Sequence, residues 1–260
     1  MKQRWLLILF LVSANCLPGW TAAAAEEEAL LQLWKSHVAL PDDHAATIKA
    51  CRDFAGAHAA DPLLPVVRGL EAWHHWRAGR QVDALQMMAA DLSAPPGAVN
   101  DGARRLAMGW ITRVDREQLA GALQAHYRKQ VAYPKTLDQL PAEARSSPHD
   151  RFGKPWNYRL TGFAKLKGFT DQKYSLESVV LGDTSDLKTA LKLPYAARLS
   201  AVPSQVLAGP SDLPAVKFNV AGSAAVVGLG QAAGHLFLAF VGTHAVVVCD
   251  YTHWKVFPRP

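Results

Sequence analysis

Between residues 26 and 92, apolar residues recur at steps of three and four positions, the spacing that places them on one face of a helix. Pro41-Asp42-Asp43 is typical of a turn followed by a helix N-cap, and Asp61-Pro62 repeats that signal. Gly79 favours a helix end, because glycine tolerates the left-handed conformation found there. The pattern predicts short antiparallel helices. Their apolar stripes are Leu63, Val66, Val67, Leu70, Trp73 and Trp76, followed by Val82, Leu85, Met88, Ala89 and Leu92.

A longer helix is predicted over residues 101–129, after a linker rich in Pro and Gly at residues 93–97. Asp115 and Gln118 resemble a capping box, which favours a break in this helix near Arg113. Beyond the helix, prolines and glycines bracket short aromatic runs, a composition typical of turns and strands.

The last part of the chain alternates short runs of Val and Phe with turn residues, which predicts a small antiparallel β-module over residues 215–260. Gly242-Thr243 suits a two-residue hairpin turn, whereas prolines between residues 194 and 214 indicate a loose connection. We therefore expect an α+β fold, with a helical hairpin array at 26–95 and a long helix plus β-hairpin at 101–193. The strands of the module are expected at 216–220, 224–227, 236–241, 245–251 and 254–257.

The first residues have the order of regions of a secretory signal peptide, which we predict over residues 1–25. Two basic residues precede an apolar stretch, and a run of small residues leads to a cleavage site near Ala24 or Ala25. The apolar stretch is shorter than the roughly 20 residues of a membrane span. The sequence thus predicts an exported protein, periplasmic or secreted, with no transmembrane anchor after cleavage. A retained anchor and lipid attachment at Cys16 are the alternatives.

Composition and charge agree with a packed globule, since half of the 260 residues are apolar and 19% are charged. The formal net charge of +6 falls to +4 without Lys2 and Arg4, because 26 basic and 22 acidic residues remain. No basic run is longer than Arg104-Arg105, whereas nucleic-acid binding requires a concentrated basic stripe. We therefore expect protein partners and no nucleic acid.

Cysteine is scarce, and only Cys51 and Cys249 remain after the predicted cleavage. In an oxidising compartment they could form one disulfide that ties the early helices to the last strands. The alternative is that each is buried separately as a small hydrophobic residue. Two cysteines are too few for a disulfide framework or a zinc ribbon.

A run of motifs orders residues 119–186: a helix from Leu119 to Tyr127, Tyr133-Pro134-Lys135-Thr136-Leu137, an Asp-x-x-Gly-x-Pro-aromatic segment at 150–160, and Tyr174-Ser175-Leu176-Glu177-Ser178. In this order and spacing the segment resembles the C-terminal globular part of the major pseudopilins of type II secretion systems. The resemblance implies a helix covered by a β-hairpin. Proline fixes the turn after the helix, and Trp156, Tyr158 and Leu160 alternate onto one strand face that can cover the helix.

The same resemblance implies a calcium ion in the loop after the last strands, where Asp183 and Asp186 are the nearest oxygen ligands. A solvated loop, or a helix N-cap before residues 187–191, is the alternative. Residues 44–92 resemble tetratricopeptide-type helical hairpins weakly. An array of that kind binds partners in its groove, so Trp73, Trp76 and Trp110 are candidate partner contacts, with core packing as the alternative.

Motifs for catalysis are missing from the sequence, which contains no G-x-S-x-G, H-E-x-x-H or Walker loop. His235, His244 and His253 suggest a metal, but the predicted hairpin sets the first two about 20 Å apart and places His235 opposite Asp250. Glu26-Glu27-Glu28 is typical of a solvated helix end. We therefore predict a non-enzymatic assembly or scaffold protein of the cell envelope. A metal-binding protein or enzyme using these histidines, and a secreted ligand-binding protein, are the alternatives.

Overall fold

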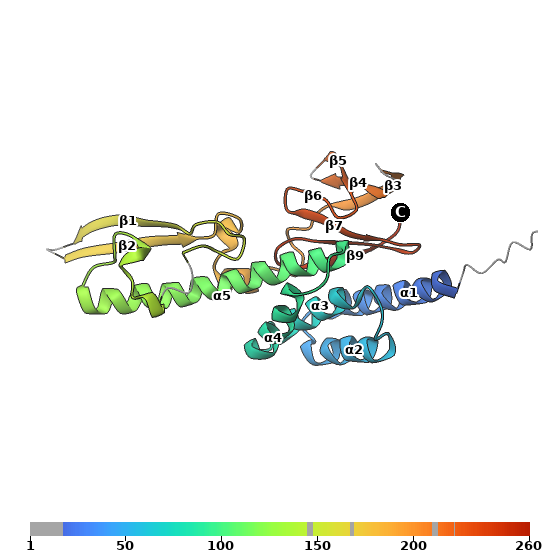
Figure 1. The fold of residues 1–260 in the computed structure, drawn as a ribbon, viewed down its shortest axis with the longest axis horizontal. Helices are drawn as coiled ribbons and strands as arrows, with labels where there is room; N and C mark the ends of the chain where they lie inside the picture. Colours follow the sequence, from blue (N-terminus) through green and yellow to red (C-terminus); the bar gives the residue numbers. More distant parts are fainter. Residues whose placement is uncertain (1–17, 145–147, 167–168, 210–212, 221) are drawn as a thin grey trace, which may run out of the picture.

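The computed structural model describes residues 18–260 except 145–147, 167–168, 210–212 and 221 (Figure 1). Residues 1–17, most of the predicted signal peptide, lie outside the described residues, so that prediction stays open. Figure 1 shows an elongated molecule with two parts. We call residues 18–113 and 187–260 the body, and residues 114–186, which extend away from it, the arm.

The N-terminal helices confirm the predicted helical array. The Asp43 carboxylate caps α2 by accepting a hydrogen bond from Ala46 N at 3.0 Å, and Gly79 follows α3 with φ of 77°. Asp61 lies before the helix that it was expected to cap, and α3 begins three residues later at Leu64. The α-helices are α1 (Pro18–Ala39), α2 (His44–Ala57), α3 (Leu64–Arg77), α4 (Gln81–Leu92), α5 (Ala98–Gln130) and α6 (Leu187–Lys192). Short 3-10 helices are η1 (Leu137–Gln139), η2 (Ala142–Ala144) and η3 (Gly182–Thr184).

The strands pair antiparallel in three sheets, which confirms the α+β class. Sequence analysis missed β3, because Pro203 indicated a loose connection. Pro203 is tolerated because β3 lies at the edge of its sheet, where one side of the strand needs no donors. The sheets are β1 (Asn157–Leu166) with β2 (Phe169–Glu177); β3 (Val202–Ala208), β4 (Pro214–Val220) and β5 (Ser223–Gly228); and β6 (Ala232–Ala233), β7 (Leu236–Val241), β8 (Ala245–Cys249) and β9 (Trp254–Pro258).

The predicted position of the turn between β7 and β8 is wrong by one residue. Val241 pairs with Val246, and Gly242 N donates a hydrogen bond to the Ala245 carbonyl oxygen at 2.9 Å, so the turn residues are Thr243 and His244. Glu27 holds this turn: its buried carboxylate accepts hydrogen bonds from the backbone N–H groups of residues 243, 244 and 245 at 3.0, 2.6 and 2.8 Å. A distant helix thus satisfies donors that do not bond within the hairpin.

The core of the body joins the helical array to the last sheet. Trp254 of β9 packs so closely on α3 and α5 that a Cβ at Gly69 or Gly102 would overlap its indole ring. At Gly109 of α5, a Cβ would overlap the carbonyl oxygen of Tyr251, in the turn after β8. The helical array and β7–β9 therefore share one hydrophobic core, whereas β4 and β5 pack in a second cluster on β7 and β8.

Helix α5 is continuous over 33 residues, so the predicted break near Arg113 is wrong. Arg113 is fully buried, and its guanidinium donates hydrogen bonds to the carbonyl oxygens of Thr184 (2.8 Å) and Tyr251 (3.1 Å) and to Thr252 Oγ1 (2.7 Å). Asp115, expected to restart a helix, binds Arg151 at 2.6 Å. The polar residues that suggested a break instead bind elements packed on the unbroken helix.

The arm has a small core of its own, as the helix-and-hairpin prediction requires. Leu119 and Leu123 of α5 pack against Trp156, Leu176 and Leu140 from the covering hairpin and the turn region. Tyr158, Tyr174 and Tyr133 surround this core, and the ring of Tyr127 stacks on Tyr133 with centroids 4.6 Å apart.

Val131 follows the last residue of α5 and has a left-handed backbone conformation that is unfavourable for valine. It has φ of 56° and is 77% exposed, although a β-branched residue is strained in the left-handed region. We expect Val131→Gly to raise the free energy of unfolding by about 1 kcal/mol, measured by urea denaturation. Val82→Gly is the control: Val82 is an exposed residue of α4, so glycine should lower stability there. A loss of stability in both variants would contradict the strain.

Candidate functional site

The three tryptophans proposed as partner contacts lie in the core. Trp73, Trp76 and Trp110 are 3%, 5% and 0% exposed, which confirms the core-packing alternative and leaves no contact surface on them. Trp76 stacks on Trp110 with ring centroids 5.6 Å apart, and Trp110 Nε1 donates to the Thr252 carbonyl at 2.9 Å. The physical reason is that sheet β6–β9 covers the face that a free helical array would expose.

Three histidines from different helices form a line of close ring nitrogens inside the body. His44 Nδ1 lies 3.0 Å from His74 Nδ1, and His74 Nε2 lies 3.1 Å from His37 Nδ1. Burial lowers the pKa of His37 to about 4 and that of His74 to about 3, so both are neutral at pH 7. Because His74 uses a different nitrogen for each neighbour, the rings form a chain of hydrogen bonds and do not converge on one ion.

The three C-terminal histidines lie in different environments. His253 is 2% exposed and its ring lies against Tyr195 with centroids 4.6 Å apart, whereas His244 is on the surface, 3.8 Å from Glu28. His235 packs against the ring of Tyr251, one residue past the predicted Asp250, because the β7–β8 register differs from the expected one. The described residues therefore do not bring His235, His244 and His253 into one site.

Cys51 and Cys249 are free, buried thiols, so the disulfide considered above is not formed in this structure. Burial raises the pKa of Cys51 to about 12 and also raises that of Cys249, which keeps both protonated. Cys249 Sγ lies 3.6 Å from the Gly102 carbonyl oxygen, in the contact between β8 and α5.

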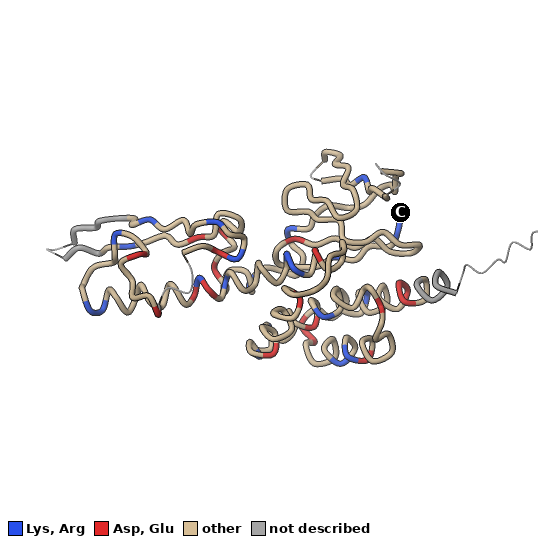
Figure 2. Tube along the Cα trace, in the orientation of Figure 1, with Lys and Arg blue, Asp and Glu red and all other residues tan. Residues whose placement is uncertain are grey.

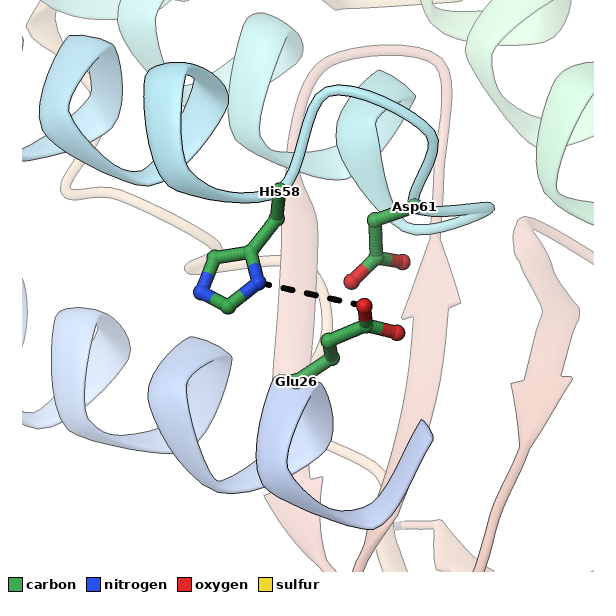
Figure 3. A group of neighbouring side chains, drawn as sticks. All are labelled: Glu26, His58 and Asp61. Carbon is green, nitrogen blue, oxygen red and sulfur yellow. Dashed lines mark ion pairs between the residues drawn. The ribbon is translucent and has the colours of Figure 1, made fainter. Parts of the chain in front are cut away.

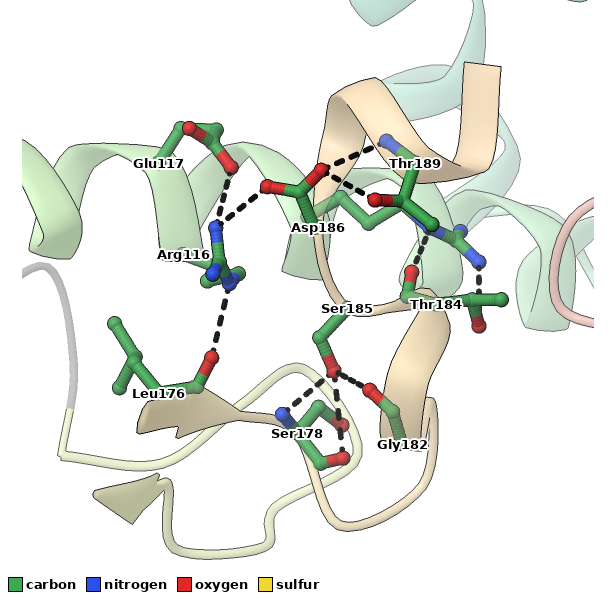
Figure 4. A network of polar contacts seen from close by, with 10 residues as sticks. Arg116, Glu117, Leu176, Ser178, Gly182, Thr184, Ser185, Asp186 and Thr189 are labelled. Carbon is green, nitrogen blue, oxygen red and sulfur yellow. Dashed lines mark hydrogen bonds and ion pairs between the residues drawn. The ribbon is translucent and has the colours of Figure 1, made fainter. Parts of the chain in front are cut away.

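The carboxylates proposed for calcium each face an arginine. Asp183 accepts a hydrogen bond from Arg198 at 2.6 Å, and this bond lowers the pKa of Asp183. Asp186 is the N-cap of α6, as the alternative expected, and accepts from Thr189 N at 2.7 Å and from Arg116 at 3.0 Å (Figure 4). A calcium ion at this loop would compete with both guanidinium groups for the same oxygens.

The Asp-x-x-Gly-x-Pro segment has a structural role around one buried carboxylate. Asp150 Oδ1 accepts hydrogen bonds from Phe152 N at 3.0 Å and Lys154 N at 2.9 Å, and Oδ2 accepts one from Ser178 Oγ at 2.6 Å. Ser178 begins the loop that Figure 4 shows packed against α5, where Ser185 Oγ accepts from Ser178 N. The motif therefore fixes the hairpin to the junction of arm and body.

A carboxylate–histidine group that sequence analysis did not identify lies between α1 and the α2–α3 loop. Figure 3 shows the side chains of Glu26, His58 and Asp61 turned toward one another, with ligand atoms all within 4.8 Å. His58 Nδ1 is 3.8 Å from a Glu26 oxygen. Burial, the negative charge of Asp61 and a side-chain hydrogen bond with Asp61 raise the pKa of Glu26. The only sequence signals were a carboxylate run and a capping aspartate, both common at helix ends.

A surface groove of about 490 Å³ borders this group, because Asp61 also lines the groove. The groove is bounded by the loop before α3, by Arg68, and by Gly97 with the first residues of α5, Ala98 to Asn100. It therefore lies within the helical part of the body and not between the helical array and the β-module.

Charge is dispersed over the described chain, and Figure 2 shows Lys and Arg interspersed with Asp and Glu. No helix among the described residues is both long and apolar enough to cross a bilayer. No protein-family model, curated protein or solved structure matched the chain. The resemblances to pseudopilins and to tetratricopeptide hairpins therefore stay predictions.

Proposed function

We propose that the chain is an exported, non-enzymatic assembly protein of the cell envelope that serves a type II secretion or pilus-like system. One observation carries this proposal: the arm extends from the body along α5 and builds a separate small core (Figure 1). The predicted signal peptide supports the location. The resemblance of residues 119–186 to pseudopilins supports the choice of system.

The outer face of the arm helix is the surface that we assign to a partner. Leu119 and Leu123 face the hairpin, so residues on the opposite side of α5 remain exposed. Gly121 and Ala125 have short side chains on this exposed side, which lets another backbone approach closely. The exposed residues at helical spacing are Gln118, Gly121, Ala125 and Arg128.

Photocrosslinking in intact cells tests the assignment. A crosslinkable residue at Ala125, on the outer face of the arm, is expected to capture components of a secretion or pilus-like system. The matched control is Val82, which is 67% exposed on α4 of the body and should capture them far less. Equal capture from both positions, or capture of none of these components at Ala125, would overturn the proposal.

A further inference from the structure

Glu26, His58 and Asp61 place one nitrogen and two carboxylate donors around a common point (Figure 3). Their ligand atoms lie within 4.8 Å of one another. Zinc–ligand distances are about 2.0–2.2 Å, so the ligands of one tetrahedral ion lie about 3.3–3.6 Å apart. Side-chain rotations that shorten the longest separations by about 1 Å bring all three residues onto one ion.

The group has an unbalanced negative charge. Asp61 is 6% exposed; its Oδ1 accepts a hydrogen bond from Leu63 N at 2.6 Å, and its Oδ2 has no hydrogen-bond partner. A buried carboxylate oxygen without a donor or a cation is costly. Among the described residues, neither Glu26 nor Asp61 forms an ion pair with Lys or Arg, and His58 is the ion-pair partner of Glu26. A bound cation supplies the missing complement in place of a hydrogen bond between the Glu26 and Asp61 carboxyl groups.

We propose that Glu26, His58 and Asp61 bind a divalent first-row transition ion of the Zn²⁺ class. Imidazole nitrogen together with carboxylate oxygen suits such ions, whereas Ca²⁺ takes six to eight oxygen ligands. The two carboxylates neutralise the charge of the ion. Three protein ligands also leave a fourth tetrahedral position for water or another ligand, beside the groove that Asp61 lines.

Binding at this site ties two distant segments together. Glu26 comes from α1, and the other two ligands come from the loop between α2 and α3. Because the unfolded chain does not hold these ligands together, the ion stabilises the folded state selectively. We therefore expect a rise in the midpoint of thermal unfolding on adding Zn²⁺.

Calorimetric titration of the metal-free protein with ZnCl₂ tests the proposal, and we expect one ion per chain. Three variants remove one ligand each: Glu26→Gln; His58→Phe, which keeps the ring packed on Phe54; and Asp61→Asn, which keeps an oxygen acceptor for Leu63 N. Each should weaken Zn²⁺ affinity by about tenfold or more, and abolish the thermal shift at low Zn²⁺. X-ray absorption of the complex should show nitrogen and oxygen ligands at about 2.0–2.2 Å.

The double variant Glu28→Gln, His244→Phe is the matched control. These residues form a second His–Glu pair with the same 3.8 Å separation, but both are well exposed and lack a second carboxylate. Circular dichroism checks that each variant is folded. Absence of one-to-one Zn²⁺ binding, unchanged affinity in all folded ligand variants, an equal loss in the control, or equally tight Ca²⁺ binding would each overturn the proposal.

Discussion

Replacing Gly109 with alanine is expected to lower the free energy of unfolding by about 3 kcal/mol, near the upper end for overpacking a core. The new Cβ would overlap the carbonyl oxygen of Tyr251. That carbonyl also accepts a hydrogen bond from the buried Arg113, so it cannot move without disturbing a second buried contact. Urea denaturation measures the loss. The close contact between α5 and the turn after β8 thus requires a residue without a Cβ at position 109.

Gly121→Ala is the control within the same helix. Gly121 is exposed, and a Cβ there would meet nothing within 4 Å, so alanine should stabilise α5 by about 0.5–1 kcal/mol. The two substitutions therefore have the same chemistry and opposite expected signs. Similar effects at both positions would show that helix propensity, and not the approach of Tyr251, decides the outcome at Gly109.

Acidification from pH 7 to 5 is expected to destabilise the protein strongly. Burial lowers the pKa of His37 to about 4 and lowers those of His74 and His253 to about 3. Unfolded histidine has a pKa near 6.5, so below that pH the unfolded chain binds protons that the folded chain does not. Each of these histidines lowers stability by about 1.4 kcal/mol per pH unit below about pH 6, and the contribution is absent well above pH 6.5.

Two buried carboxylates act in the opposite direction. Burial raises the pKa of Asp91 to about 6 and also raises that of Asp250, so the folded chain takes up these protons first as the pH falls. Glu26, whose pKa is also raised, acts in the same direction as these carboxylates. Because the histidine shifts are the larger ones, we expect a net loss of stability between pH 6 and 5.

Unfolding in urea at several pH values, with and without His253→Phe, measures this dependence. The phenyl ring preserves packing against Trp73 and Tyr195 and removes His253 Nε2, which is buried without a hydrogen-bond partner. In the variant, the slope of the free energy of unfolding against pH should be smaller by the equivalent of about one proton. The same slope in wild type and variant would contradict a neutral, buried His253.

Local sequence signals predicted those parts of the fold that local interactions determine. Asp43 caps α2 and Gly79 ends α3, because both depend on a few neighbouring residues. The continuity of α5 through Arg113 and the position of the β7–β8 turn depend on partners more than 60 residues away. No local pattern reports that Glu27 supplies the acceptors for that turn.

The candidate metal group was beyond sequence analysis for the same reason. Glu26 resembles one member of a solvated acidic run, His58 follows a helix, and Asp61 has the signature of a cap. Each has a common structural explanation by itself. Only the packing of α1 beside the α2–α3 loop brings the three side chains together. The histidine line through His74 depends on the packing of helices in the same way.

Because α5 is continuous from the body into the arm, a small rotation where it leaves the body displaces its far end. Arg113 is hydrogen-bonded to Thr184 of the arm and to Tyr251 and Thr252 of the body. From there the helix continues 17 residues to Gln130, which at 1.5 Å per residue is about 25 Å. A tilt of about 10° at the held end would swing the far end by about 4 Å, close to the rise of a full helical turn. Small rotations at the junction would thus become large displacements at the tip.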